Sequence, residues 1–380
     1  MADNKDKKVL NVPALRFPEF TEEWKKIRLG DNCNIQMCKR IMAAQTNTEG
    51  GVPFYKIGTI GGKADAYISK DLFDEYKRKY SYPNKGEVMI TCAGTVGKCV
   101  IYDGEDSYYQ DSNIVWIDNP NEIISNDFLY HLLSNINWSY LNSTTIVRIY
   151  NDDLRNLKLC CPRLDEQKKI ANFLSLIDER IAAQNKIIED LRLLRDAISV
   201  CLLSPKSDWK CYKVSEIADI GRGRVISSKE IANQNNPQYP VYSSQTSNEG
   251  VMGYLDNYAF DGEYITWTTD GANAGTVFYR NGRFNCTNVC GTLKLHYQFD
   301  AYYCSLVLAN ATKKYVSVNL ANPKLMNNTM AAIKLYLPPF QEQKTMAQLF
   351  RKMDENITLE HKLLLSYQKQ KHYLLQQMFI

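Results

Sequence analysis

The sequence lacks the residue spacings typical of metal-binding and disulfide-rich proteins. Its 11 cysteines include no Cys-x-x-Cys pair, and its 4 histidines lack zinc-finger spacing. We therefore expect reduced, mostly buried thiols rather than a metal site or disulfides. It also has no signal peptide and no apolar run of membrane-spanning length, so we expect a soluble, cytoplasmic protein.

The sequence contains incomplete versions of two catalytic motifs. Residues 236–239 (Asn-Pro-Gln-Tyr) lack the second proline of the Asn/Asp-Pro-Pro-aromatic loop with which amino-methyltransferases hold a flipped base. Residues 92–99 lack the first glycine and the final hydroxyl of a phosphate-binding loop. We interpret both as turns, and the acidic pair Asp152-Asp153 as a solvated turn before a strand. The sequence thus predicts no catalytic site, no metal site and no cofactor in this chain.

One stretch occurs twice, at an offset of 176 residues, first from Pro162 to Leu203 and again from Pro338 to the last residue. Both copies show an apolar seven-residue repeat, which is typical of a long helix buried along a partner helix. The seam positions are Ile170, Leu174, Ile177, Ile181, Ile188 and Leu191 in the first copy, and Met346, Phe350, Met353, Ile357, Leu364 and Leu374 in the second. The polar interruptions also match, Gln184 with Glu360 and Arg195 with Lys371, which indicates an internal duplication.

The segments before these helices also resemble each other. Trp24 matches Trp209, and the turn at 94–97 matches the glycine-rich turn at 271–275, whereas the loops between such anchors differ. Short apolar runs at 52–57, 88–92, 99–102, 114–117 and 157–161 predict strands, and 128–138 predicts a helix. We expect a disordered segment at 1–12, domains at 13–161 and 205–337, and long helices at 162–204 and 338–380.

This order of domain, helix, domain and helix resembles the specificity subunit of type I restriction–modification enzymes. The resemblance covers about residues 13–380 and is carried by a Pro-x-x-x-Glu-Gln-Lys-x-x-Ala-x-x-(Leu/Phe) signature, present twice. Its positions are Pro162, Glu166, Gln167, Lys168, Ala171 and Leu174, then Pro338, Glu342, Gln343, Lys344, Ala347 and Phe350. The segment 16–20 with Trp24, and 94–98 with Gln110-Asp111, also fit the family.

The resemblance implies a mixed α/β (α+β) fold with two similar target-recognition domains, separated by two long antiparallel coiled-coil helices in a pseudo-twofold repeat. Each domain is expected to read one half of a split, asymmetric double-stranded DNA sequence. Two adenine methyltransferase subunits are expected to dock on the helices, and an ATP-dependent motor-nuclease subunit can join them. S-adenosylmethionine, ATP and magnesium would belong to those partners.

Candidate DNA-contacting residues are loop side chains that can bind phosphates or base edges. In the first domain they are Lys39, Arg40, Lys56, Thr59, Thr91, Lys98, Arg148 and Tyr150. In the second they are Arg222, Arg224, Ser243, Ser244, Gln245, Thr246, Thr268, Thr269, Arg283, Lys313, Lys314 and Asn319.

The distribution of charge favours a DNA-binding chain whose affinity for DNA depends on partner proteins. The net charge is only +4, and residues 13–160 carry seventeen basic against nineteen acidic residues. Because phosphate neutralisation supplies most non-specific affinity, such a domain should bind DNA weakly alone. Two alternatives stay open, a stand-alone bipartite DNA-binding regulator and a protein-binding scaffold. Gel shifts with and without a methyltransferase partner would separate all three.

The repeat also predicts how the long helices pair. In a parallel, in-register pair, Arg195 and Lys371 would lie side by side in an apolar seam, where like charges repel and resist desolvation. We therefore predict an antiparallel pair, with these cations near opposite ends and able to reach water. In a cysteine-depleted background, cysteines near Ile170 and Leu374 should form a disulfide efficiently. Crosslinking of position 170 to position 346 would contradict the antiparallel arrangement.

Overall fold

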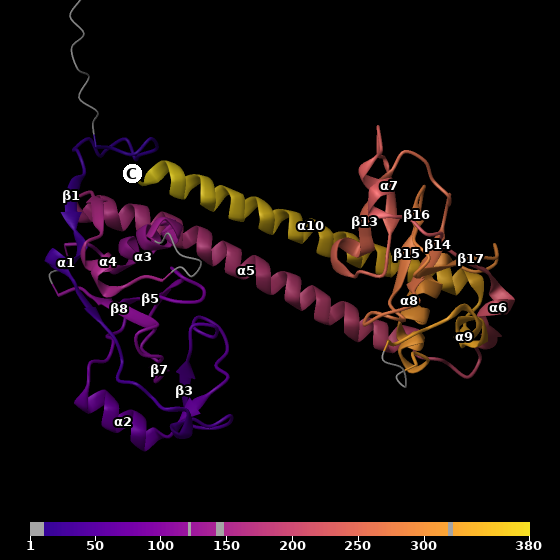
Figure 1. Cartoon of the computed structure of the whole chain (residues 1–380), viewed down its shortest axis with the longest axis horizontal. Coiled ribbons are helices and arrows are strands. Elements are labelled where there is room, and N and C mark those ends of the chain that lie inside the picture. Colours follow the sequence, from indigo (N-terminus) through magenta and orange to yellow (C-terminus); the bar gives the residue numbers. More distant parts are fainter. Residues whose placement is uncertain (1–10, 121–122, 142–147, 318–321) are drawn as a thin grey trace, which may run out of the picture. The chain divides into compact units, whose positions relative to one another are not determined.

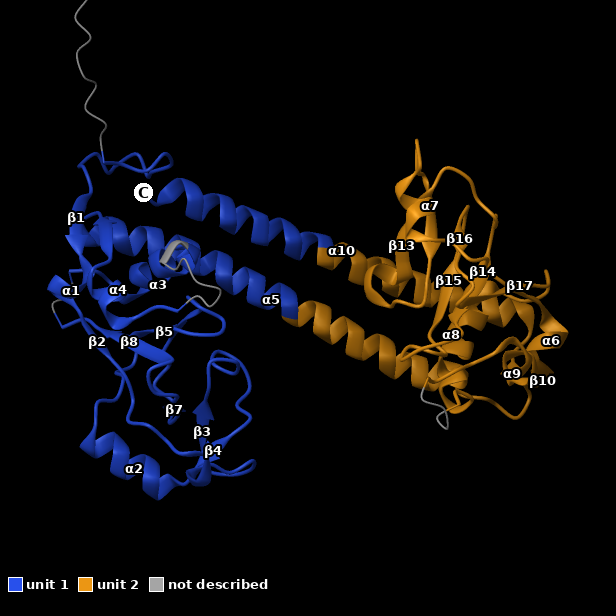
Figure 2. Cartoon of the chain, in the orientation of Figure 1, with its two compact units in different colours: residues 1–185, 362–380 blue, residues 186–361 orange. Residues whose placement is uncertain are grey.

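The computed structural model describes residues 11–120, 123–141, 148–317 and 322–380, with the side chains of 140 and 141 left aside. The predicted disordered segment 1–12 lies almost wholly outside these residues. The chain forms two compact units, residues 1–185 with 362–380, and residues 186–361 (Figure 2). Each unit contains one α/β domain and one end of both long helices, α5 (Leu164–Leu203) and α10 (Phe340–Met378).

The domain of unit 1 contains three small sheets. The four-stranded sheet has the order β2-β8-β5-β6 and is antiparallel throughout, and the three-stranded sheet has the order β4-β3-β7 with β3 and β7 parallel. The first strand, β1, pairs with the last, β9. The strands are β1 (Lys25–Arg28), β2 (Asn34–Gln36), β3 (Val52–Tyr55), β4 (Tyr67–Ile68), β5 (Val88–Thr91), β6 (Cys99–Ile101), β7 (Tyr108–Tyr109), β8 (Ile114–Asp118) and β9 (Lys158–Cys161).

The domain of unit 2 repeats this topology strand for strand. Figure 1 labels five of its strands, β13 to β17. Its sheets have the orders β11-β17-β14-β15, β13-β12-β16 and β10-β18, and β12 pairs with β16 in parallel as β3 does with β7. The predicted duplication is therefore confirmed. The strands are β10 (Lys210–Lys213), β11 (Ala218–Arg222), β12 (Tyr239–Tyr242), β13 (Val251–Leu255), β14 (Tyr264–Thr268), β15 (Val277–Arg280), β16 (Asn285–Cys286), β17 (Cys290–Leu295) and β18 (Lys334–Leu337).

The shorter helices show what the two domains share and where they differ. In each domain a helix packs against two neighbouring strands of the four-stranded sheet, α3 against β5 and β6 in unit 1 and α8 against β14 and β15 in unit 2. By contrast, α2 follows β4, whereas the much shorter α7 precedes β12. The helices are α1 (Leu29–Asn32), α2 (Lys70–Lys79), α3 (Asn126–Asn135), α4 (Asn151–Arg155), α6 (Val214–Ile217), α7 (Ser228–Ala232), α8 (Ala301–Ala311) and α9 (Asn327–Ala332), with 3-10 turns η1 (Ala43–Gln45), η2 (Trp138–Leu141), η3 (Ser247–Gly250) and η4 (Thr312–Lys314).

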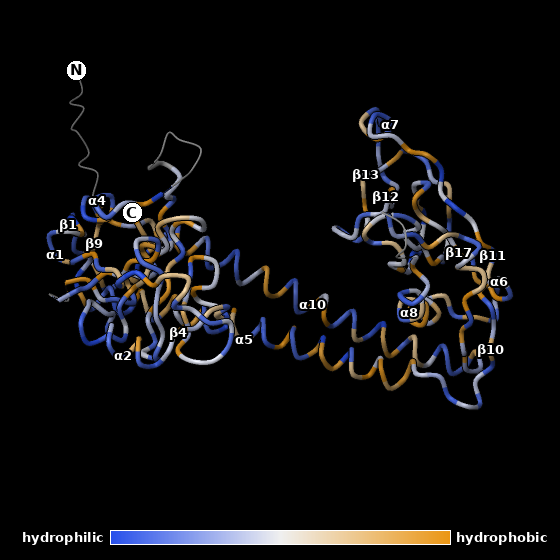
Figure 3. The backbone as a smooth tube through the Cα atoms, turned by 60° about the horizontal axis from the view of Figure 1, so that its bottom comes forward, coloured by the Kyte–Doolittle hydropathy of each residue, from blue (hydrophilic) through white to orange (hydrophobic). Residues whose placement is uncertain are grey.

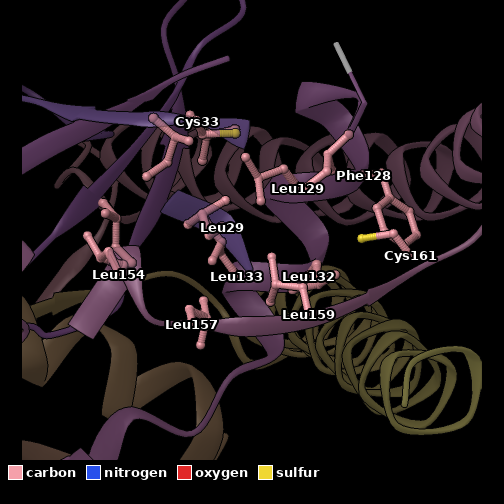
Figure 4. Close-up of a cluster of buried hydrophobic side chains, with 14 of the residues drawn as sticks. Leu29, Cys33, Phe128, Leu129, Leu132, Leu133, Leu154, Leu157, Leu159 and Cys161 are labelled. Atoms are coloured by element: carbon pink, nitrogen blue, oxygen red, sulfur yellow. The ribbon is translucent and has the colours of Figure 1, made fainter. Parts of the chain in front are cut away.

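Both long helices contribute side chains to the core of each domain. In unit 1, Ile170 and Leu174 of α5 and Leu374 and Met378 of α10 belong to the cluster that contains Phe128, part of which Figure 4 shows. In unit 2, the end of α5 and the start of α10 share a second cluster. The start of one helix thus meets the end of the other in both units, which confirms the antiparallel pairing.

The twelve residues predicted for the seam have little solvent exposure. All twelve are buried or half-buried, and Leu174 and Phe350 are fully enclosed. Hydrophobic and hydrophilic residues alternate along both helices in Figure 3. The seam therefore has the amphipathic character that the seven-residue repeat predicts.

The prediction for the two seam cations is wrong in one respect. They do not simply extend into water, because each forms an ion pair with an aspartate of the other helix. Arg195 Nε lies 2.5 Å from Asp354 in unit 2, and Lys371 Nζ lies 2.5 Å from Asp178 in unit 1. Asp178 and Asp354 also correspond at the offset of 176 residues. The two aspartates therefore neutralise the two cations, Arg195 and Lys371, that interrupt the apolar seam.

A buried glutamine joins each domain to its long helix. In unit 1, Gln167 Nε2 donates to the carbonyl of Pro162 at 2.9 Å, and its Oε1 accepts from the Ser125 amide, at the N-cap of α3, at 2.8 Å. In unit 2, Gln343 makes the equivalent bonds to Pro338 at 2.9 Å and to Asp300, the N-cap of α8, at 3.0 Å. The Gln of the duplicated signature is thus a structural residue.

Loss of this amide should destabilise the domain. Gln343→Ala leaves the Asp300 amide and the Pro338 carbonyl unpaired in a buried position, which costs about 1–3 kcal/mol per group. We expect urea unfolding of unit 2, followed by hydrogen exchange of β18, to shift to lower urea. Gln341→Ala, an exposed position in the same helical turn, is the matched control. Equal shifts for the two variants would show that the buried amide has no special role.

Candidate nucleic-acid interface

In unit 1, polar loop residues gather around the turn between β7 and β8, which we call the β7–β8 turn (residues 110–113). Arg40 Nε donates to Asp111 at 2.7 Å, and Arg148 Nη2 donates to the carbonyl of Ser112 at 3.4 Å. Residues that are distant in the sequence therefore meet at one turn. Two hollows share Ser112, one of about 330 Å³ lined by Arg40 and Lys56, and one of about 290 Å³ lined by Arg148 and Tyr150.

The other candidates of unit 1 have different surroundings. Lys56 forms an ion pair with Asp65 at 2.9 Å, and Thr59 bonds the backbone of Lys56. Lys39 Nζ lies 5.4 Å from the centre of the Tyr80 ring, at the end of α2. Lys98 Nζ donates to the carbonyl of Ile60.

Thr91 is fully buried and does not reach the surface. Its hydroxyl donates to the carbonyl of Thr95 and accepts from the Lys98 amide at 3.0 Å. These bonds close the glycine-containing turn between β5 and β6, where Gly97 has a φ of +83°. This turn is the structure that we predicted for residues 92–99. We therefore remove Thr91 from the proposed contact residues.

In unit 2, Arg222 at the end of β11 ties three segments together. Its guanidinium donates to the carbonyl of Asn288, to the hydroxyl of Thr269 at 3.1 Å and to the carboxylate of Asp270 at 3.2 Å. Asp270 also lies 3.5 Å from Lys324 Nζ. Arg222 thus connects its strand to the turn after β16 and to the loop after β14.

Two further arginines of unit 2 are exposed and paired with acidic residues. Arg224 binds Glu230 of α7 through both terminal nitrogens, with Nη1 to Oε2 at 3.0 Å. This hydrogen bonding lowers the pKa of the Glu230 carboxyl, which keeps it charged. Arg283 pairs with Asp261 at 3.2 Å and lies over the Tyr258 ring at 4.7 Å.

The serine- and threonine-rich loop after β12 faces the same segments. Ser243 Oγ accepts from the hydroxyl of Thr287 at 3.4 Å, and the carbonyl of Ser244 accepts from Asn273 at 3.4 Å. Gln245 bonds within its own loop, to the carbonyl of Val251, and Thr246 is exposed. The loop is therefore adjacent to the turn after β16 and to the loop after β14.

The remaining candidates of unit 2 fall into three groups. Thr268 and Thr269 are buried, 1% and 0% exposed, so we remove them as we did Thr91. Lys313 and Lys314 are exposed on η4, next to Thr312, whose hydroxyl donates to the carbonyl of Gly275 at 2.8 Å. Asn319 lies outside the described residues.

The sequence analysis missed Asn288, Lys324 and Arg280. Asn288 lies in the counterpart of the β7–β8 turn, so alignment of the repeat around Gln110-Asp111 could have found it. Arg280 is 6% exposed, with its guanidinium 3.6 Å from the centre of the Tyr242 ring. It supports η3 by donating to the carbonyl of Glu249 at 2.6 Å. No pattern in the sequence distinguishes Lys324 from a solvated lysine.

The described residues hold few features of another kind of site. Among them, no group of three or more histidine, cysteine and acidic side chains is placed to hold a metal ion. In the same part of the chain, no helix is long and apolar enough to cross a membrane. Seven of the cysteines are buried, and burial raises the pKa of Cys38 to about 12 and of Cys33 to about 11.

The fold and the loops define a duplicated recognition protein, with one scaffold that presents two different polar surfaces. The family model for the type I restriction modification DNA specificity domain matches residues 21–193 and again residues 206–366. The chain belongs to this family.

Individual relatives agree with the family assignment. A putative type I restriction enzyme specificity subunit of Haemophilus influenzae is 47% identical over 186 residues, which cover 49% of this chain and 46% of the relative. The chain thus spans about half the length of that relative. The S subunit of a type I restriction–modification system from M. genitalium has the same fold, with a TM-score of 0.67 at 18% identity, covering 97% of this chain and 99% of that one. A chain from a study of type I complex assembly gives a TM-score of 0.57 at 14% identity, with 94% and 97% covered.

The contacts of Arg222 and Arg224 predict different effects of their removal on stability. Arg222→Ala removes bonds to the turn after β16 and to the loop after β14, and it should lower the free energy of unfolding of unit 2 by about 1–3 kcal/mol. Arg224→Ala removes an exposed pair within one loop and should cost less than about 1 kcal/mol. Urea titration followed by hydrogen exchange of β17 measures both. If Arg224→Ala is the more destabilising variant, Arg222 is not the residue that holds the loops together.

Proposed function

We propose that this chain is the DNA sequence-recognition subunit of a type I restriction–modification complex. In this function, each domain reads one half of a bipartite, asymmetric target on double-stranded DNA. The supporting observation is the pair of loop clusters at equivalent places in a duplicated scaffold, around the β7–β8 turn and around its counterpart after β16. Both clusters contain arginines with amide or hydroxyl side chains, which are the groups that bind phosphates and read base edges.

The contact residues that we propose are the candidates with exposed or half-exposed side chains. Tyr150, 59% exposed, can pack against a sugar or base, and Arg148 lies 5.7 Å from its ring centre. In unit 2, Arg224, Arg283 and Thr246 reach the surface directly. Arg222 instead acts mainly as a positioning residue, since its nitrogens bond both the turn after β16 and the loop after β14.

The outer faces of the long helices support the docking of other subunits. Large apolar side chains are exposed there, although the seam already buries the residues that join the helices to each other. On α5 they include Leu176, Leu193, Leu194 and Val200, and on α10 Leu359, Leu365 and Tyr373, each more than half exposed. Exposed apolar surface of this kind typically marks a protein–protein interface. We propose that two adenine methyltransferase subunits bind these faces, and that a motor-nuclease subunit can join them.

Catalysis belongs to those partners in this proposal. The sequence at 236–239 and at 92–99 departs from the loops that hold a flipped base and a phosphate, so in this proposal S-adenosylmethionine, ATP and magnesium bind to the partner subunits. A stand-alone DNA-binding regulator is the main competitor. It would bind its target tightly without methyltransferase subunits, and it would leave the apolar helix faces without a function.

Exchange of one domain should change one half of the recognition sequence. Residues 13–160 would be replaced by the same segment of a relative with a different target, and the methylome of cells with the native methyltransferase subunits would be sequenced. We expect a new first half-site and an unchanged second half-site, because each domain has its own core and its own loop cluster. Replacement of 206–336 is the reciprocal control. Change of the whole sequence, or of neither half, would contradict the proposal.

A further inference from the structure

Several exposed arginines of the loops that we propose to contact DNA form ion pairs with carboxylates of the same domain. Arg40 is paired with Asp111, Arg224 with Glu230 and Arg283 with Asp261. Arg222 and Lys324 share Asp270. These partners come from different elements, and Glu230 belongs to α7, at a position where unit 1 has the 3-10 turn η1 in place of an α-helix. The pairing is therefore a recurring property of the loops rather than the consequence of one motif.

Ion pairs of this exposure contribute little to stability. The side chains of Arg224 and Glu230 are 48% and 34% exposed, and those of Arg283 and Asp261 are 52% and 54% exposed. Exposed pairs stabilise a fold by about 0–1 kcal/mol, because solvent screens them and their ordering costs entropy. Stability alone thus gives no strong reason for a carboxylate beside each arginine.

The carboxylates have a larger effect on what the arginines can bind. A phosphate group and a guanine edge both offer two acceptor atoms to a guanidinium, but the phosphate is an anion whereas the base is neutral. A carboxylate that stays next to the arginine repels the phosphate and has little effect on the base. It also cancels the positive charge that would release counterions from the DNA backbone, which is the main source of sequence-independent affinity.

We propose that Glu230 is a specificity-determining residue, which neutralises Arg224 so that this arginine binds base edges in preference to backbone phosphates. Asp261 acts in the same way on Arg283. This inference rests on the proposed function, because it concerns how the same loops distinguish the target from other DNA. It accounts for basic loop residues in a chain whose net charge is only +4.

Glu230→Gln in the full-length chain tests the inference. The substitution keeps the shape of the side chain and removes its charge. Binding to a duplex without the target sequence is measured by fluorescence anisotropy between 50 and 200 mM salt. One additional phosphate contact steepens the slope of log K against log salt by about 0.9, equivalent to an extra three- to fourfold loss of affinity over this range. We expect this change for Glu230→Gln, with tighter binding at 50 mM.

Glu22→Gln is the matched control. Glu22 forms an exposed pair with Arg163 at 3.2 Å, and this pair lies at the start of α5 rather than in the recognition loops. We expect this variant to bind the non-target duplex as the unaltered chain does. An unchanged slope for Glu230→Gln, or an equal change for both variants, would overturn the inference.

A second measurement separates neutralisation of Arg224 from general repulsion between Glu230 and DNA. In an Arg224→Ala background, Glu230→Gln should change the non-target affinity much less than it does in the unaltered chain. An equal change in both backgrounds would show that Glu230 acts on DNA directly and would overturn the inference. A weaker affinity for the target with an unchanged non-target affinity would also overturn it, since Glu230 would then only position Arg224.

DNA methylation in cells with the native methyltransferase subunits tests the proposed function separately. Chains with Glu230→Gln should methylate additional sites that differ from the target in the second half only, and the first half should stay unchanged. Methylation confined to the original target, with non-target binding unaltered, would overturn the inference and leave the proposed function intact. If the unaltered chain directs no methylation and binds no DNA, both proposals are wrong.

Discussion

Two buried glutamine side chains determine where each domain ends and each long helix begins. An amide can donate and accept at once, so Gln167 and Gln343 each bond a proline carbonyl one turn earlier and the N-cap amide of another helix. This junction fixes the direction in which the helix leaves its domain. Ile170 and Leu174, one and two turns further on, can therefore enter the core of the domain, and the long helix becomes part of that core.

The same junction sets the register of the helix pair. Because the helices are duplicates and run antiparallel, Asp178 meets Lys371 in one unit and Asp354 meets Arg195 in the other. Partly buried ion pairs add little net stability, but a shift in register would leave four charges unpaired beside the seam. The copies differ near the domain entry. Glu166 accepts hydrogen bonds from Arg16 and Trp24, whereas Glu342 pairs with Lys206.

Prediction from the sequence succeeded where a pattern repeats along the chain and failed where a side chain depends on a distant loop. The duplication, the seam residues and the antiparallel pairing followed from periodicity and from one offset. The choice of contact residues rested instead on side-chain type, and it placed Thr91, Thr268 and Thr269 in the interface, although all three are buried. The hydroxyl of Thr91 closes the turn between β5 and β6, and the sequence does not distinguish this orientation from one that faces solvent.

The sequence by itself determined the two-domain order and the helix pair, because seven-residue periodicity and a constant offset of 176 residues can be read along the chain. The resemblance to the family rested on the signature that begins at Pro162 and again at Pro338. Only the tertiary structure decided which carboxylate neutralises which arginine. Arg40 and Asp111 are 71 residues apart, and Arg222 and Asp270 are 48 apart. Coulomb attraction depends on distance in space, and the sheets alone bring these loops together. The electrostatic character of the interface is therefore a property of the folded chain.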